Sequence, residues 1–406
     1  MALFITDDLI EYLGQKILFN VWDDLYNLIT NLCKKKDDEI RQAAAYGIGI
    51  FTKFTDDNFN KYAEGLINAL KEVIDNSGEI LQKNELNELF KKIMTFFQNL
   101  EKKRLNLVSK QENKKTTKKG NEDDSSEDNL SELIDEDIEN IQNIQSEISD
   151  LIGILFKTHK QISGDIINII LNEFLPKFSK STSNFELKMA LFITDDLIEY
   201  LGQEMLNNVW NDLYNLITTL CIKNDDEIRL AAAYGIGIFA KFTKINFDKY
   251  AEGLLNSLKE GMKISPNEDN EESWGLAHDN LISSIGKILF YQSNSEIVKK
   301  YLNELIDVWI NNLPIKYDST EQEEQHEWLC DFVLNKNELI NEKWYNNIFK
   351  SLAFIYDSKN SNDNINQKIL KIFEGVKNNE KMKNIVQDVY NNAESKIKNK
   401  LEKLIK

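Results

Sequence analysis

The chain has few residues of the types that usually carry catalysis or bind metals. Its three histidines, His159, His278 and His326, lie in different parts of the sequence. None has a partner at the H-x-x-x-H spacing that places two imidazoles on one helix face around a zinc ion. No G-x-S-x-G elbow, H-E-x-x-H motif or P-loop occurs either. We therefore expect no metal site, no cofactor and no enzymatic activity.

The cysteines and the paired carboxylates give no specific catalytic pattern. Cys33, Cys221 and Cys330 are odd in number and far apart, which is typical of a reduced protein without disulfides. Cys330 lies in the apolar stretch HEWLCDF, which suits a buried thiol better than an activated one. Adjacent acids such as Asp7 and Asp8 are too common in this acidic chain to nominate a general acid and a general base.

Composition and charge indicate a helical protein that does not bind nucleic acid. Of 406 residues only 3 are proline and 16 are glycine, whereas a β-sandwich or barrel needs turn residues about every 10 positions. The formal net charge of −18 repels a phosphate backbone and suits basic partners. No apolar run reaches the roughly 18 residues of a membrane span. The start, MALFITDD, lacks the basic region of a signal peptide.

One segment of the chain occurs twice. Residues 1–72 match residues 189–260 at about four positions in five, which indicates a duplicated segment. Each copy carries two glycines inside a helical pattern, DDEIRQAAAYGIGIF and DDEIRLAAAYGIGIF, and each glycine costs about 1 kcal/mol relative to alanine. We interpret the small residues, which are Ala231 to Ala233, Gly235 and Gly237, as a packing device. Dispersion contacts with a closely approaching helix offset the cost.

The apolar pattern predicts an all-α fold built from helical pairs. From about residue 146 onward, helix-like segments come in pairs of roughly forty residues, as in HEAT-type arrays. The second helices are amphipathic, and in 204–221 the apolar residues form one broad stripe at 3.6-residue spacing. We predict a HEAT-repeat (armadillo-type) α-solenoid superhelix, with HEAT-like pairs over 1–110 and a carboxy-terminal array over 146–406.

Residues 111–145 interrupt this pattern. A basic stretch, QENKKTTKKG, is followed by the acidic NEDDSSEDNLSELIDEDIEN. We expect a flexible loop or linker, because so polar a segment buries little apolar surface. Most such runs only solvate the chain, but a mobile acidic loop inside a curved array can also attract a basic segment. Its acidic residues are Glu122, Asp123, Asp124, Glu127, Asp128, Asp135, Glu136 and Asp137.

The tryptophans permit two interpretations. Aromatic side chains at helical spacing usually pack in the core. The sharper alternative is that some of them line grooves between neighbouring helices and receive Phe side chains from a partner. The positions are Trp22, Trp210, Trp274, Trp309, Trp328 and Trp344.

The segment MALFITDDLIEYLG followed by DDEIRLAAAYGIGIFAKF closely resembles the carboxy-terminal third of importin-beta-type nuclear transport receptors. The similar branch is importin beta three, whose E-(V/I)-R-x-A-A-A-Y-G-(L/I)-G element is matched at Glu227, Ile228, Arg229 and 231–237. EISDLIGILFKTHK, LISSIGKILFY and the W-x-x-x-L-P that ends at Pro314 are also similar. The resemblance covers roughly residues 146–400, and 1–75 as the repeated portion.

The resemblance implies a karyopherin found in the cytoplasm, in the nucleus and at the nuclear pore. Such a receptor binds basic protein cargo and the GTPase Ran on its concave face and Phe-Gly nucleoporins in outer grooves, without direct nucleic-acid contact or membrane insertion. On the polar side of the second helices we name four candidate cargo contacts, Asp212, Glu252, Glu304 and Asp307.

The family's amino-terminal repeats, which carry its main Ran contact, have no counterpart here. We therefore expect the carboxy-terminal portion of a longer receptor with a duplicated piece attached. The alternative is a generic HEAT scaffold for another complex, such as one that contains a phosphatase.

Overall fold

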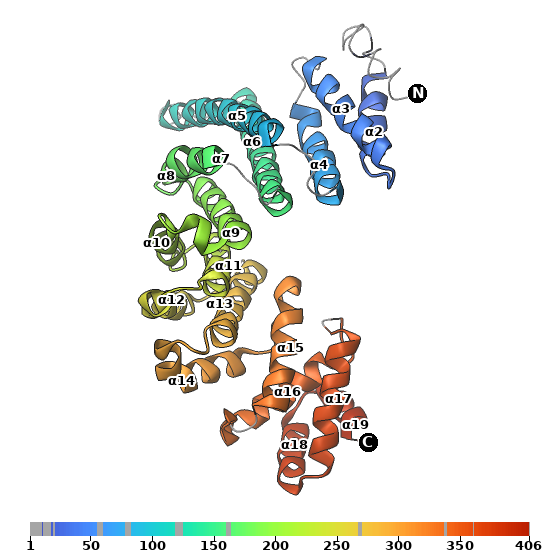
Figure 1. The fold of residues 1–406 in the computed structure, drawn as a ribbon, viewed down its shortest axis with the longest axis vertical. Coiled ribbons are helices and arrows are strands. Elements are labelled where there is room, and N and C mark those ends of the chain that lie inside the picture. The colour runs from blue at the N-terminus through green and yellow to red at the C-terminus, as the bar shows by residue number, and fades with distance from the viewer. Residues whose placement is uncertain are drawn as a thin grey trace. The chain divides into compact units, whose positions relative to one another are not determined.

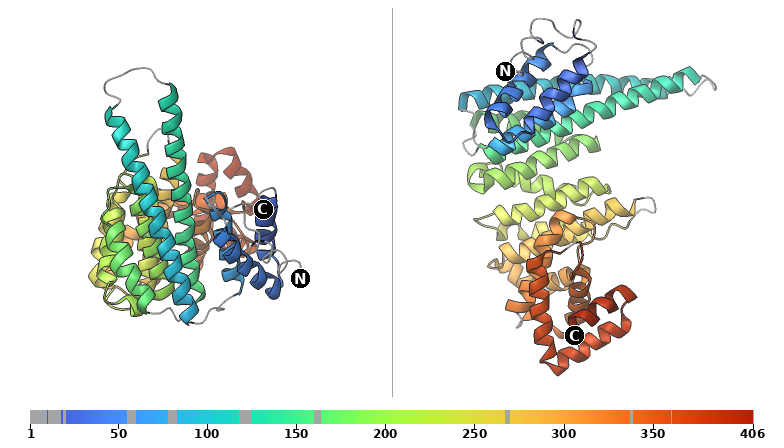
Figure 2. Two further views of the ribbon diagram at one scale, coloured as in Figure 1. Left: turned by 90° about the horizontal axis from the view of Figure 1, so that it is seen from above. Right: turned by 90° about the vertical axis from the view of Figure 1, so that its right-hand side faces the viewer.

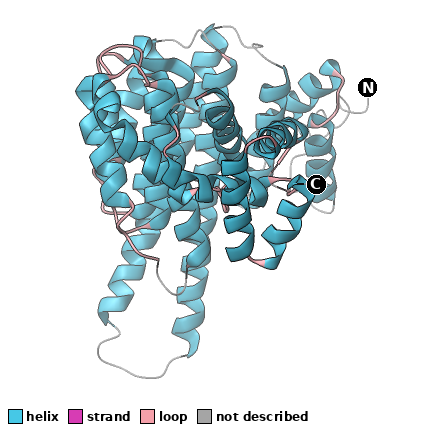
Figure 3. Ribbon diagram, turned by 90° about the horizontal axis from the view of Figure 1, so that it is seen from below, coloured by secondary structure: helices cyan, strands magenta, loops and turns pink. Residues whose placement is uncertain are grey.

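The computed structural model describes residues 1–406 except 1–9, 11–17, 19–20, 55–59, 78–82, 118–124, 160–163, 267–269, 337–338, 360 and 406. Within the described residues, all regular secondary structure is helical (Figure 3). The predicted all-α class is therefore confirmed. The chain divides into two compact units, residues 1–201 and 202–406.

The amino-terminal unit begins with the described part of the first copy of the repeat (Figure 1). Its helices are α2 Trp22–Cys33, α3 Asp38–Phe54, α4 Asn60–Ser77, α5 Lys83–Thr117, α6 Ser125–Thr158, α7 Gly164–Ile169, the π-helical turn η3 Ile170–Phe174, α8 Leu175–Phe178 and α9 Asn184–Leu206. α2 packs on α3 and α4, and α4 packs on α6. The first unit ends near a kink in α9 at Gly202, whose φ of 68° favours glycine.

The carboxy-terminal unit is a two-layered array of helices. They are α10 Trp210–Leu220, α11 Asp226–Phe242, α12 Asp248–Gly261, α13 Glu271–Tyr291, α14 Glu296–Asn312, α15 Ser319–Asn335, the 3₁₀ turn η5 Glu342–Trp344, α16 Tyr345–Ile355, α17 Asp363–Lys377, α18 Glu380–Asn392 and α19 Ser395–Ile405. Odd-numbered helices from α11 to α17 pack on one another in order, and even-numbered helices from α10 to α18 do the same. This is the predicted HEAT-type solenoid, in which first helices form one layer and second helices the other.

The two copies of the repeat fold in the same way. Trp22 stacks on Phe51 with ring centroids 4.6 Å apart, and the equivalent Trp210 stacks on Phe239 at 4.6 Å. α3 and α11 have identical bounds after the offset between the copies, 38–54 and 226–242. The first copy is therefore an intact helical unit over its described residues.

The glycines of the repeat permit close helix packing. A methyl group at Gly237 would lie 2.7 Å from Lys287 Cδ and 2.8 Å from Ser284 Oγ of α13. Ser284 Oγ donates a hydrogen bond to the carbonyl of Ala233 at 2.5 Å. Asp225 caps the start of α11 by accepting a backbone N–H at 3.0 Å. The predicted packing role of these small residues is confirmed.

The segment predicted to be a flexible linker is helical where the structure describes it. α5 extends to Thr117 and α6 begins at Ser125, and these two long helices run side by side (Figure 2). α6 buries Ile134, Ile141 and Ile144. The prediction of a flexible segment over 111–145 is therefore wrong for 111–117 and 125–145. Apolar residues spaced along one face give the acidic sequence a packing stripe.

Candidate functional site

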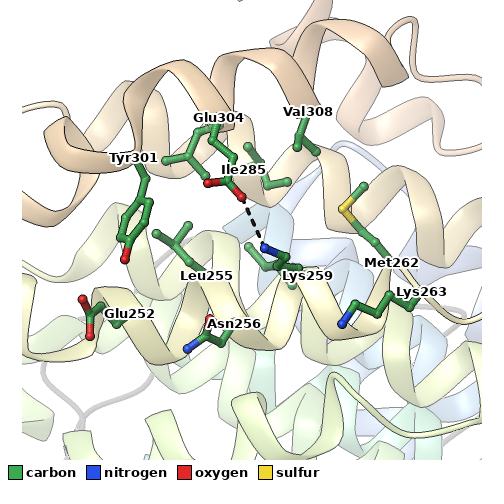
Figure 4. A pocket seen from close by; sticks show the side chains of 12 residues that line it. Glu252, Leu255, Asn256, Lys259, Met262, Lys263, Ile285, Tyr301, Glu304 and Val308 are labelled. Carbon is green, nitrogen blue, oxygen red and sulfur yellow. Dashed lines mark hydrogen bonds and ion pairs between the residues drawn. The ribbon is translucent and has the colours of Figure 1, made fainter.

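A groove of about 480 Å³ lies between the second helices α12 and α14 (Figure 4). Its floor is apolar, because Leu258 of α12, Ile285 of α13 and Leu305 of α14 are all buried. Both second helices are amphipathic, so they turn their apolar stripes towards α13 and present charged residues at the rim. The groove therefore combines an apolar floor with a charged edge.

Two exposed ion pairs cross the rim of this groove. Lys259 Nζ lies 3.4 Å from Glu304 Oε1, and Lys300 Nζ lies 3.5 Å from Glu252 Oε1. All four side chains are more than half exposed, and such pairs contribute only about 0–1 kcal/mol. A cationic ligand can therefore replace a lysine beside either carboxylate at little energetic cost.

The structure brings together two of the four candidate cargo contacts. Glu252 of α12 and Glu304 of α14 both line the groove, where Glu304 lies opposite Lys259 (Figure 4). Asp212 is exposed in the first turn of α10 and does not line the groove.

Asp307 is held by a structural contact instead. Its Oδ1 accepts a hydrogen bond from the indole Nε1 of Trp344 at 2.7 Å and lies 2.5 Å from Lys343 Nζ. Hydrogen bonds from Lys343 and then from Trp344 lower the pKa of this carboxyl. Because both partners belong to η5, Asp307 joins α14 to the next helical pair.

Three groove residues were not singled out from the sequence. Lys259, Lys263 and Tyr301 line the rim together with the two glutamates. Lys259 follows Glu252 by seven positions, or two helical turns, and this spacing was the available signal. Their role depends on the register of α14 against α12, which a pattern within one helix does not give.

The acidic run does not form the predicted loop. Glu122, Asp123 and Asp124 lie outside the described residues, and Glu127 and Asp128 lie in the first turns of α6. The remaining three, Asp135, Glu136 and Asp137, are exposed on α6. Three of the eight acidic residues are therefore exposed on a helix.

The three cysteines are buried and lie far apart in the sequence. All three cysteines are free and buried, and burial raises the pKa of Cys33 to about 11 and those of Cys221 and Cys330 to about 12. Within the described ranges, no group of three or more histidine, cysteine or acidic side chains is placed to hold a metal ion. Nor is any described helix both long and apolar enough to cross a membrane.

The tryptophans differ in how deeply they are buried. Trp22, Trp210, Trp309 and Trp344 are buried, whereas Trp274 and Trp328 are only partly buried. Trp328 of α15 stacks on Phe290 of α13 with centroids 4.4 Å apart, and Phe290 is 54% exposed. An aromatic pair thus lies open at the junction of two first helices.

No protein-family model matches this chain. In sequence, the chain is similar to importin subunit beta-3 of Saccharomyces cerevisiae, with 27% identity over 157 residues. That match covers 37% of this chain and 13% of the relative.

Over the whole length of this chain, the structure is similar to part of Kap121p. A crystal structure of Kap121p matches with a TM-score of 0.58 and 15% identity, and one of Kap121p bound to RanGTP matches with 0.61 and 16%. The sequence similarity to importin subunit beta-3 and the shared fold both agree with the predicted resemblance to importin-beta-type receptors. The predicted resemblance is thereby confirmed, as is the HEAT-repeat class.

The chain spans about a third of the length of the solved structures that it matches. Both structures are covered to 36% of their own chains, whereas 100% and 99% of this chain are covered. Kap121p bound to Pho4p is a further match, with a TM-score of 0.55 and 17% identity. Two of these structures are thus of Kap121p bound to another protein, RanGTP or Pho4p.

Proposed function

We propose that the chain acts as part of a nuclear transport receptor and contributes a binding surface for basic protein cargo. The observation that carries this proposal is the groove between α12 and α14. It presents Glu252 and Glu304 over an apolar floor on the second-helix layer. Similarity to Kap121p structures bound to RanGTP and to other proteins supports it.

The proposed binding depends on charge and shape complementarity, and no covalent bond is made or broken. A lysine-rich segment places an ammonium group beside Glu252 or Glu304 and lays its aliphatic carbons on the floor formed by Leu258 and Leu305. The net charge of −18 steers such a segment towards the chain. The affinity therefore falls as salt concentration rises.

We also propose that the chain binds Ran and Phe-Gly nucleoporins. The exposed Phe290 and its stacking partner Trp328 offer an aromatic surface on the first-helix layer that suits a Phe side chain. Together with Ran binding, this surface allows the chain to take part in movement between cytoplasm and nucleus through the pore.

The test is binding of the full chain to three probes. They are a fluorescent lysine-rich import-signal peptide, immobilised Phe-Gly repeats and GTP-loaded Ran. A transport receptor binds the peptide and the Phe-Gly repeats, and peptide binding weakens with salt. Retention of neither probe would overturn the proposal and favour a generic HEAT scaffold. Failure with Ran alone removes Ran from the partners and leaves cargo binding intact.

A further inference from the structure

A second pocket, of about 270 Å³, lies where the first helices α15 and α17 begin. These two helices pack on each other within the carboxy-terminal unit. The pocket shares no lining residue with the groove between α12 and α14. The polar and charged residues that line it include Lys316, Ser319, Gln322, Glu323, Lys359 and Asn362.

Gln322 is buried beside this pocket with no hydrogen bond for its side chain. The residue lies near the start of α15, is only 5% exposed and lines the pocket. Its backbone N–H donates to the carbonyl of Asp318 at 3.2 Å, but its side-chain amide has no partner among the described residues. A buried amide without a partner costs about 1–3 kcal/mol. A ligand in the pocket would provide the missing hydrogen bonds.

Two cations at the same pocket are also unpaired. Lys316 precedes α15 and Lys359 precedes α17, and both residues are exposed. Neither ammonium group makes an ion pair or a hydrogen bond with another described residue. Lys368 of α17, in contrast, pairs with Glu327 at 2.8 Å and with Asp331 at 2.7 Å. In a chain with a net charge of −18, two unpaired ammonium groups at one pocket indicate an anionic ligand.

The carboxylates near the pocket already have hydrogen-bond donors. Glu323 lines the pocket, and its Oε1 accepts a hydrogen bond from Asn362 Nδ2 at 2.6 Å. Asp318 accepts from Asn280 Nδ2 at 2.7 Å and caps α15 by accepting from the backbone N–H of Thr320 at 2.9 Å. The starts of α15 and α17 add the positive ends of two helix dipoles. The two lysines are therefore available to an anion from outside the chain.

We propose that this pocket binds a phosphate group. The donors without a partner among the described residues are the ammonium groups of Lys316 and Lys359, the amide of Gln322 and the hydroxyl of Ser319. A phosphate monoester has three acceptor oxygens for these donors, whereas a carboxylate has only two. The phosphate is either free or attached to a side chain of another protein. This inference rests on the pocket alone and is independent of the import proposal.

The test is isothermal titration calorimetry of the full chain with inorganic phosphate, with a short peptide phosphorylated on serine and with the same peptide unphosphorylated. We expect saturable binding of phosphate at one site and no binding of the unphosphorylated peptide. Tighter binding of the phosphopeptide than of inorganic phosphate identifies a protein side chain as the source, and the reverse order identifies a free phosphate. Acetate at the same concentration should not displace either probe.

Two variants of the pocket test the assigned donors. Q322L removes the buried amide and should weaken phosphate binding at least about tenfold without lowering the melting temperature, because no hydrogen bond of the free chain is lost. K316E/K359E should abolish binding. The control K371E/K377E changes the net charge equally at exposed positions of α17 that do not line the pocket, and should leave binding unchanged.

Three results would overturn the proposal. They are the absence of binding for both phosphate probes, equally tight binding of acetate, and phosphate binding that survives K316E/K359E.

Discussion

Lys259 and Glu304 pair across an open groove, and both side chains remain more than half exposed. The equivalent lysine of the first copy, Lys71, is only 16% exposed and pairs with both Glu147 and Asp150. One duplicated sequence thus makes an open ionic rim in one copy and a closed helix contact in the other. The difference arises from the packed neighbour, α14 or α6, because the lysine is the same.

The two copies provide a matched test of packing at the small residues. Ala233 is fully buried under α13, whereas Ala45 is partly exposed. We expect A233L to lower the free energy of unfolding by about 1–3 kcal/mol through overpacking. A45L should lower it by less than A233L does, because Ala45 is only partly buried. Urea denaturation of both variants measures this, and equal losses would contradict the assigned packing.

The carboxyl of Asp196 makes stability depend on pH. Burial, followed by the nearby Asp150 and Glu199, raises its pKa from 3.8 to about 8. The folded chain therefore keeps a proton that the unfolded chain releases, so this group lowers stability as the pH rises from about 4 to about 8. We expect D196N to increase the free energy of unfolding at pH 7 by on the order of 2 kcal/mol. Denaturation across this pH range measures the effect.

The dependence of the unfolding free energy on pH separates the effect of Asp196 from that of a general change in charge. D135N removes one exposed carboxylate from α6 and should leave the slope unchanged. An unaltered slope in D196N would show that Asp196 is ionised in the folded chain.

The hydrogen bond between Asp307 and Trp344 should stabilise the folded chain. D307A leaves the buried indole N–H of Trp344 without this acceptor. We expect a loss of about 1–3 kcal/mol in the free energy of unfolding. D307N retains an acceptor oxygen and should lose less. If the two variants were equally stable, the hydrogen bond would not contribute.

The cysteines should be unreactive in the folded chain. Thiolates are the reactive form, and burial holds the thiol pKa values at about 11 and about 12. Titration with a thiol reagent at pH 8 should modify Cys33, Cys221 and Cys330 only after denaturation. Fast reaction of any of the three in the native chain would show that its helix opens.

Much of the fold was predictable because each helical pair carries its own periodicity. The stripe of the second helices and the small residues of the duplicated segment depend on local spacing, and the structure contains both. The helix at 125–145 was not predicted because the sequence is strongly acidic. Its apolar residues at helical spacing, which include Ile134, Ile141 and Ile144, were overlooked. These residues become buried only when α4 and α5 lie beside them.

The site was less predictable because it depends on contacts between helices. Glu252 and Glu304 were chosen for their polar faces, and they line one groove only because α14 lies beside α12. Asp307 has the same pattern as Glu304 in the sequence, but η5 folds against it and supplies Trp344. Such a partner, 37 positions away, cannot be inferred from spacing within one helix.

The central proposal is that the acidic rim of the groove binds basic cargo, and reversal of its charges tests it most directly. The measurement is the affinity of a fluorescent lysine-rich import-signal peptide for the full chain, for E252K/E304K and for the control E64K/E296K. The control changes the net charge equally, at exposed positions that do not line the groove. We predict a loss of at least about tenfold for the groove variant and less than about twofold for the control. Equal affinities for the two variants would contradict the account.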